Sequence, residues 1–241
     1  MLFALQVLAL AVDLPLLFLI ITSLLRGTWR RFPLVLVLTL VELISALVQM
    51  PGAIEHALGR SAPGMRFAQV YWVSQTTFRL LVYAVVIGFL YQACGRLRSV
   101  KPSRIGLIVG ACLVAGGTLL ASYDGSLTPG RWLTPWLRDV TFIGALMDLM
   151  LWTLLVASRD KDHQLLLLSG GLGVEFAGDA IGDSLRQLAI QPRSHALWMT
   201  GNLVTIAAGA FRYYAWWRAL RRQPAEDARA SRAALPQAGF L

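Results

Sequence analysis

The sequence predicts an all-α, polytopic membrane protein, a bundle of seven transmembrane helices. Hydrophobic residues make up 56% of the chain and charged residues only 15%, whereas about a quarter of the residues in soluble globular proteins are charged. The mean hydropathy is +0.60. Apolar runs of about twenty residues, the length that crosses the hydrocarbon core of a bilayer, alternate with short segments rich in arginine. These observations argue against a water-soluble fold.

The seven apolar runs are separated by short loops, which leave no room for a second folded domain. The first run has no preceding positive charge and no small-residue cleavage site, so we interpret it as a permanent span rather than a signal peptide. Residues 1–222 are expected to form the transmembrane domain and residues 223–241 a disordered cytoplasmic tail. The expected spans are 2–25, 32–54, 67–93, 105–122, 137–157, 165–188 and 196–220.

The distribution of Lys and Arg predicts the orientation, because these residues are enriched in cytoplasmic loops. Of the 22 Lys and Arg residues, two lie within spans, fourteen lie on one side and six on the other. The N-terminus is therefore expected outside and the C-terminus in the cytoplasm, in a multi-pass protein of the cell inner (plasma) membrane. The fourteen are Arg26, Arg30, Arg31, Arg96, Arg98, Lys101, Arg104, Arg159, Lys161, Arg218, Arg221, Arg222, Arg229 and Arg232, and the six are Arg60, Arg66, Arg131, Arg138, Arg186 and Arg193.

Aromatic residues gather near both expected interfaces, as amphipathic rings do at the headgroup level. We interpret this belt as structural. Its members are Tyr71, Trp72, Trp132, Trp136 and Trp198 outside, and Trp29, Tyr91, Tyr213, Tyr214, Trp216 and Trp217 inside.

Six carboxylates and two arginines fall within the expected spans, where a charged residue at the helix centre costs about 2.5 to 3.5 kcal/mol. They are therefore expected to face the bundle interior or a wet cavity. Arg212 is expected instead to extend to the cytoplasmic surface beside Tyr213 and Trp216. The other seven form a candidate intramembrane polar network: Arg79, Asp148, Glu175, Asp179, Asp183, Glu42 and Asp13.

The sixth span carries the densest group, since Glu175, Asp179 and Asp183 recur every four residues and share one helical face. This face predicts either a proton or cation path, an acid and base pair, or a hydrogen-bond network that only fixes helix packing. Asp183 is also close enough to Arg186 to lie at the interface. In the third span Gln75, Arg79 and Tyr83 form a polar stripe, and the expected partner of Arg79 is Asp148 or Glu175.

Asp13 and two pairs of glycines allow a structural interpretation. Asp13 precedes Pro15 by two residues, so it either caps a broken first helix or takes part in chemistry. Gly106 with Gly110, and Gly178 with Gly182, have the GxxxG spacing that allows close helix approach, and we predict that both pack against neighbouring helices.

The sequence lacks the residues that several functions require. A retinal Schiff base needs a lysine in the last span, but the only lysines are Lys101 and Lys161 in loops. The three histidines also lie in loops, so neither a cofactor nor a metal site is expected. No zinc-ligand spacing, helix-turn-helix or basic arm indicates nucleic-acid binding, and the net charge of +9 is explained by the loops and the tail.

Three segments carry a resemblance to known proteins: YWVSQTTFRLLVYAVVIGFLY from Tyr71 to Tyr91, the preceding RRFPLVLVLTL, and the later RDVTFIGALMDLMLW. In layout they resemble a group of uncharacterised seven-span integral membrane proteins of bacteria, abundant in soil acidobacteria. The resemblance implies seven spans and no established activity. The stretch from Asp179 to Asp183 is also similar to bacterial lysoplasmalogenase-type membrane proteins, which carry carboxylates within spans.

Three functions are compatible with this pattern. The first is a non-enzymatic sensor, accessory or assembly module, because the loops are minimal and no catalytic set is recognisable. The second is a small transporter or proton/cation conduit that uses Glu175 and Asp179 with Arg79. The third is a lipid-directed hydrolase with Asp179 and Asp183 as acid and base. Membrane lipids are the expected surroundings, with another membrane protein or a second copy of the chain as partner.

Overall fold

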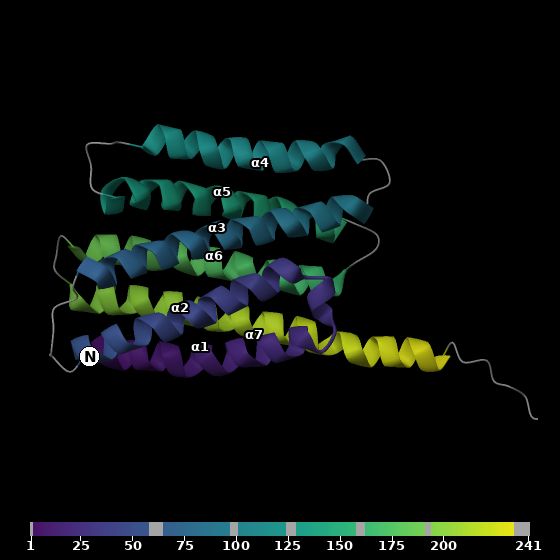
Figure 1. The fold of residues 1–241 in the computed structure, drawn as a ribbon, viewed down its shortest axis with the longest axis horizontal. Helices are drawn as coiled ribbons and strands as arrows, with labels where there is room; N and C mark the ends of the chain where they lie inside the picture. Colours follow the sequence, from purple (N-terminus) through teal and green to yellow (C-terminus); the bar gives the residue numbers. More distant parts are fainter. Residues whose placement is uncertain are drawn as a thin grey trace, which may run out of the picture.

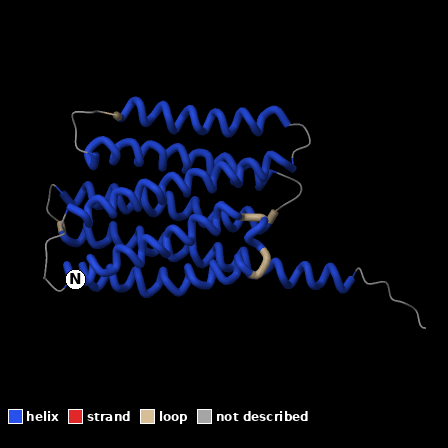
Figure 2. Tube along the Cα trace, viewed as in Figure 1, coloured by secondary structure: helices blue, strands red, loops and turns tan. Residues whose placement is uncertain are grey.

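The computed structural model describes residues 2–57, 65–96, 101–123, 129–157, 162–190 and 194–233. Within these ranges the chain forms seven α-helices and one 3-10 helix, and no strand (Figure 2). Five residues of the charge count, Arg60, Arg98, Arg159, Lys161 and Arg193, lie outside the described residues. The helices are α1 (Leu2–Leu25), η1 (Thr28–Arg30), α2 (Pro33–Ala57), α3 (Met65–Arg96), α4 (Lys101–Ser122), α5 (Pro129–Ala157), α6 (His163–Ile190) and α7 (His195–Ala233).

The all-helical class predicted from the sequence is confirmed, and each expected span falls on its own helix. Two boundaries differ. Helix α5 begins at Pro129 instead of residue 137, because proline is well tolerated in the first helical turn. Helix α7 continues to Ala233, so residues 223–233 are helical and not disordered as predicted; their Ala, Arg and Glu residues favour helix. Residues 234–241 lie outside the described residues.

Three helices are long and apolar enough to cross a membrane: the segments are Trp72–Cys94, Pro135–Ala157 and His163–Ala189, of 23, 23 and 27 residues. The described surface is also strongly apolar. Leu113 and Leu120 of α4 are 70% and 80% exposed. Phe142, Leu146 and Leu149 are exposed along one face of α5. Soluble monomers rarely expose apolar patches of this extent, so the surface is that of a membrane protein.

The helices lie side by side along the long axis of the molecule, and consecutive helices run in opposite directions (Figure 1). Helix α4 forms one edge and packs on α3 and α5. Helices α1 and α7 pack together at the other edge, and α6 lies against both α5 and α7. Helix α1 is continuous through Pro15, so the first helix is not broken there and Asp13 does not cap it.

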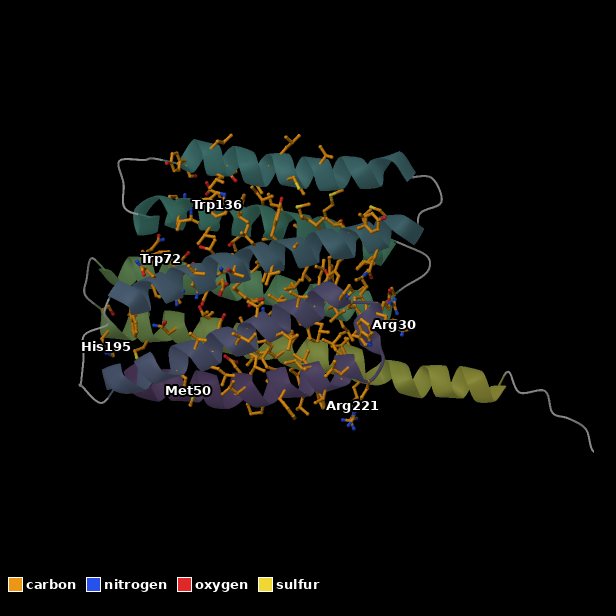
Figure 3. All side chains as sticks on the ribbon, in the orientation of Figure 1. Arg30, Met50, Trp72, Trp136, His195 and Arg221 are labelled. Carbon is orange, nitrogen blue, oxygen red and sulfur yellow. The ribbon has the colours of Figure 1, made fainter. Side chains whose placement is uncertain are left out.

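One end of the bundle is joined by polar contacts between distant parts of the chain. Arg31, just after η1, binds Asp162 at 2.7 Å and Gln164 at 2.9 Å. Asp162 also caps α6, because its side chain accepts hydrogen bonds from the backbone N–H groups of Gln164 and Leu165. Figure 3 shows Arg30 and Arg221 at this end and Trp72 and His195 at the opposite end.

The main apolar core lies toward this same end. Its buried side chains come from the last turns of α1, α3 and α5 and from the first turns of α2 and α6. The C-terminal half of α7 completes it with Trp216 and Leu220. The other half of the bundle holds a smaller cluster around Trp136 and Val140. The interior is therefore densely apolar at the Arg30 end and leaves room for polar groups toward the Trp72 end.

Candidate functional site

Arg212 of α7 lies at the centre of the buried polar groups, with its side chain only 1% exposed. One terminal nitrogen donates to Glu175 of α6 at 2.9 Å, and the other donates to Glu42 of α2 at 2.5 Å. The guanidinium also lies 4.4 Å from the ring centre of Tyr213 and 5.6 Å from that of Phe78, a distance at which cations and rings attract. One cation thus ties three helices together.

This burial corrects the prediction that Arg212 extends to the cytoplasmic surface. Tyr213 and Trp216, predicted to belong to the interfacial belt, are buried with it. The indole N–H of Trp216 donates to the backbone carbonyl of Leu168 at 2.8 Å. Trp136 is likewise buried and donates to Ala115 of α4. These rings lie near the ends of the expected spans, but the helix faces that carry them point toward neighbouring helices, so the indole N–H groups find partners inside the protein.

Arg79 of α3 pairs with Asp179 of α6, not with Asp148 or Glu175 as predicted. A terminal nitrogen of Arg79 lies 2.7 Å from a carboxylate oxygen of Asp179. Glu175 lies one turn along α6, within electrostatic range of both Arg79 and Arg212. The acidic face of α6 therefore meets two arginines, one from α3 and one from α7.

The Arg79–Asp179 pair forms part of the wall of a cavity of about 410 Å³ between α3, α5 and α6. Its wall also includes Trp72, Gln75 and Asp183. Asp183 is 59% exposed at the mouth and binds Arg186, as the sequence indicated. Asp179 and Asp183, the acid and base of the hydrolase hypothesis, thus share a cavity but are held by different arginines.

A second cavity of about 150 Å³ lies between α1, α2, α3 and α7. Asp13 and Glu42 line it together with Ser45, Ser74 and Gln75. One carboxylate oxygen of Asp13 and one of Glu42 are buried without a hydrogen-bond partner. Gln75 borders both cavities, so this residue of the polar stripe predicted in the third span lies between the two spaces.

Asp148 is the one predicted network residue that lies apart from these groups. Its carboxylate accepts a hydrogen bond from the Ser169 hydroxyl at 2.8 Å, at the buried contact between α5 and α6. Tyr83, the last residue of the predicted stripe, donates to the carbonyl of Ala111 in α4 and also lies outside the network. Both side chains connect helices and do not border either cavity.

The contact between α6 and α7 depends on glycine. A Cβ atom on Gly178 would overlap the methyl group of Ala208, and one on Gly182 would overlap the Thr205 hydroxyl. The packing predicted for this pair is therefore confirmed. The prediction for Gly106 and Gly110 is wrong, because a Cβ on either would meet nothing within 4 Å; α4 lies at the edge of the bundle and presents these residues outward.

The assembled network contains Asp13, Glu42, Glu175 and Asp179 against Arg79 and Arg212, so acids outnumber bases by two. Arg212 is the member that was predicted to lie at the cytoplasmic surface instead. The sequence contained an indication of its burial, since six acids within spans need more cations than Arg79 alone.

Within the described ranges, no three His, Cys, Asp or Glu side chains gather into a group that could hold a metal ion. No family model, no curated protein and no solved structure matches this chain.

Proposed function

We propose that this chain is a seven-span protein of the bacterial inner membrane, with its N-terminus outside and its C-terminus in the cytoplasm. Three observations support the proposal. The shortest of the seven α-helices, α4, has 22 residues, and about 20 residues are needed to cross a bilayer. Consecutive helices alternate in direction. The end that carries Arg30 and Arg221 (Figure 3) is rich in positive charge, which favours the cytoplasm. Membership of the acidobacterial seven-span group is part of this proposal.

Within this membrane protein, we propose a non-enzymatic role as a sensor or accessory module. The observation that carries the proposal is the asymmetry of the interior. Both cavities lie toward the Trp72 end, whereas the Arg30 end is filled by the main apolar core. The larger cavity would admit a ligand between α3, α5 and α6. Such an interior suits binding from one side, with a signal passed to another membrane protein or a second copy.

A proton or cation conduit is the second candidate, and one observation favours it. Gln75 borders both cavities, so a change in its rotamer would join them into one polar path that reaches Glu42 and Asp13. Glu175 and Asp179 lie beside this path. A conduit would then need one further opening, through the apolar core at the Arg30 end.

Reconstitution distinguishes the two candidates. Purified protein is placed in liposomes that contain a pH-sensitive dye, and a membrane potential is imposed with potassium and valinomycin. The module predicts the same proton flux as protein-free liposomes at pH 6, 7 and 8. Flux above this level that disappears in Asp179→Asn would reject the module in favour of the conduit.

Complementation gives the module a positive test. In a strain that lacks the gene, Asp179→Asn is expected to complement the deletion, because Arg79 retains Glu175 within electrostatic range. Gly178→Leu is expected to fail, because the side chain would force α6 and α7 apart. A module that works through helix contacts requires that Asp179→Asn functions and Gly178→Leu does not. A functional Gly178→Leu with an inactive Asp179→Asn would contradict the module.

A further inference from the structure

We infer that the smaller cavity, between α1, α2, α3 and α7, is a binding site for a monovalent alkali cation. The inference is independent of the sensor proposal, because it concerns a different cavity and different carboxylates. It begins with two oxygen atoms. One oxygen of Asp13 and one of Glu42 are buried and accept no hydrogen bond, although buried carboxylate oxygens in proteins are nearly always paired.

The unpaired oxygen of Glu42 belongs to a buried side chain. Its side chain is only 8% exposed, and its other oxygen is held by Arg212. The unbonded oxygen therefore has no access to bulk water, and the residue lines the cavity. An ionised oxygen in such a place is strongly unfavourable unless a positive group reaches it.

Arg212 does not supply that charge for both acids. It divides its two terminal nitrogens between Glu42 and Glu175, while Arg79 is engaged by Asp179. Asp13 lies within electrostatic range of Glu42, which repels it, and of Arg212, which is paired with Glu42 and Glu175 instead. The excess negative charge of the network thus lies on the side of the cavity, where a mobile cation would offset it.

The remaining wall has the chemistry that a hard cation requires. Ser45, Ser74 and Gln75 contribute hydroxyl and amide oxygens next to the two carboxylates, and oxygen is the ligand that hard cations prefer. A volume of about 150 Å³ holds an ion with several waters, since each water takes about 30 Å³. Calcium fits less well, because its sites use six to eight oxygen ligands.

Thermal unfolding in detergent tests the site, with sodium as the probe. Melting is followed by tryptophan fluorescence in NaCl and in choline chloride at equal concentrations, since choline is too bulky for the cavity. At a sodium concentration 100 times Kd, we expect the wild-type Tm to rise by about 5 to 10 °C. Asp13→Asn is expected to lose this response. Asp148→Asn, which removes a buried carboxylate outside the cavity, is expected to keep it.

Milder variants keep the test decisive if Asp13→Asn does not fold. Ser45→Ala and Ser74→Ala leave both carboxylates in place and remove one neutral oxygen each, and the sodium concentration for half of the Tm shift should rise about tenfold. An unchanged value in both would overturn the site. Equal Tm values in NaCl and choline chloride at pH 6, 7 and 8 would do the same, and would mean that protons alone neutralise these acids.

Discussion

Arg212 shows how a buried charge organises a membrane bundle. Its guanidinium donates hydrogen bonds to both Glu42 and Glu175. Among the described residues, it is the only positively charged group that bonds to both. Breaking a buried ion pair by removing one partner usually costs about 3 to 5 kcal/mol, because the other charge is left uncompensated. Arg212 therefore contributes more to the folded state than a surface arginine does.

We predict that Arg212→Gln lowers the stability of the protein in detergent by about 3 to 5 kcal/mol. For a chain of this size, this corresponds to a fall in Tm of about 6 to 20 °C. The control is Arg138→Gln, which breaks an exposed pair with Asp139 and should change stability by no more than about 1 kcal/mol.

The triple variant Arg212→Gln, Glu42→Gln, Glu175→Gln identifies the cause. If uncompensated charge is responsible, the two added substitutions should recover a large part of the lost Tm. A triple variant that melts below the single variant would instead mean that Arg212 acts through its packing on Phe78, Tyr213 and Trp216.

Sequence reasoning reached part of this site. It predicted that the carboxylates and Arg79 face the bundle interior, because a charge that faces lipid at mid-depth is costly, whereas Asp183 is 59% exposed. It did not find the pairing of Arg79 with Asp179, since Asp148, Glu175 and Asp179 all lie at accessible depths and only the rotation of each helix decides which one meets α3. It misplaced Arg212 for the same reason.

At the scale of helices, the contact between α6 and α7 is the most extensive one among the described residues. Gly178, Gly182 and Gly201 let the two backbones approach, and the carbonyl of Gly201 would lie 2.8 Å from a Cβ on Gly182. The same two helices carry Glu175, Asp179 and Arg212. The close contact and the ion pair between Arg212 and Glu175 thus join the same two helices.

We predict that Gly182→Ala destabilises the protein by about 1 to 3 kcal/mol, because the added methyl group has no space. The matched control is Gly117→Ala in α4, where a Cβ meets nothing within 4 Å. It should cost nothing, or gain up to about 1 kcal/mol through helix propensity. Thermal melts of the two variants provide the comparison, and equal melting temperatures would mean that the contact is looser than described.

For the molecule as a whole, the polar and apolar interiors occupy different halves. The apolar core joins six helices at the Arg30 end, and the cavities lie in the half toward Trp72. Helix α4 packs mainly on α3 and α5. It contributes no residue to either of the two cavities. We therefore expect α4 to be the helix whose alteration disturbs the polar network least.

Reporter fusions test the proposed topology. Green fluorescent protein fused after Ala233 should fluoresce, because it folds in the cytoplasm. Alkaline phosphatase fused after residue 125, between α4 and α5, should be active, because it requires the oxidising exterior. The opposite pattern at both positions would invert the orientation, and cytoplasmic reporters at both would remove at least one span.

The helices and the membrane class followed from the sequence because both depend on short segments. An apolar run long enough to cross a bilayer satisfies its own backbone hydrogen bonds, whatever its neighbours are. The partner of Arg79, the burial of Arg212 and Trp216, and the two cavities that Gln75 borders depend instead on how helices distant in the chain rotate and pack. Those contacts involve atoms from several helices at once, so only the tertiary structure decided them.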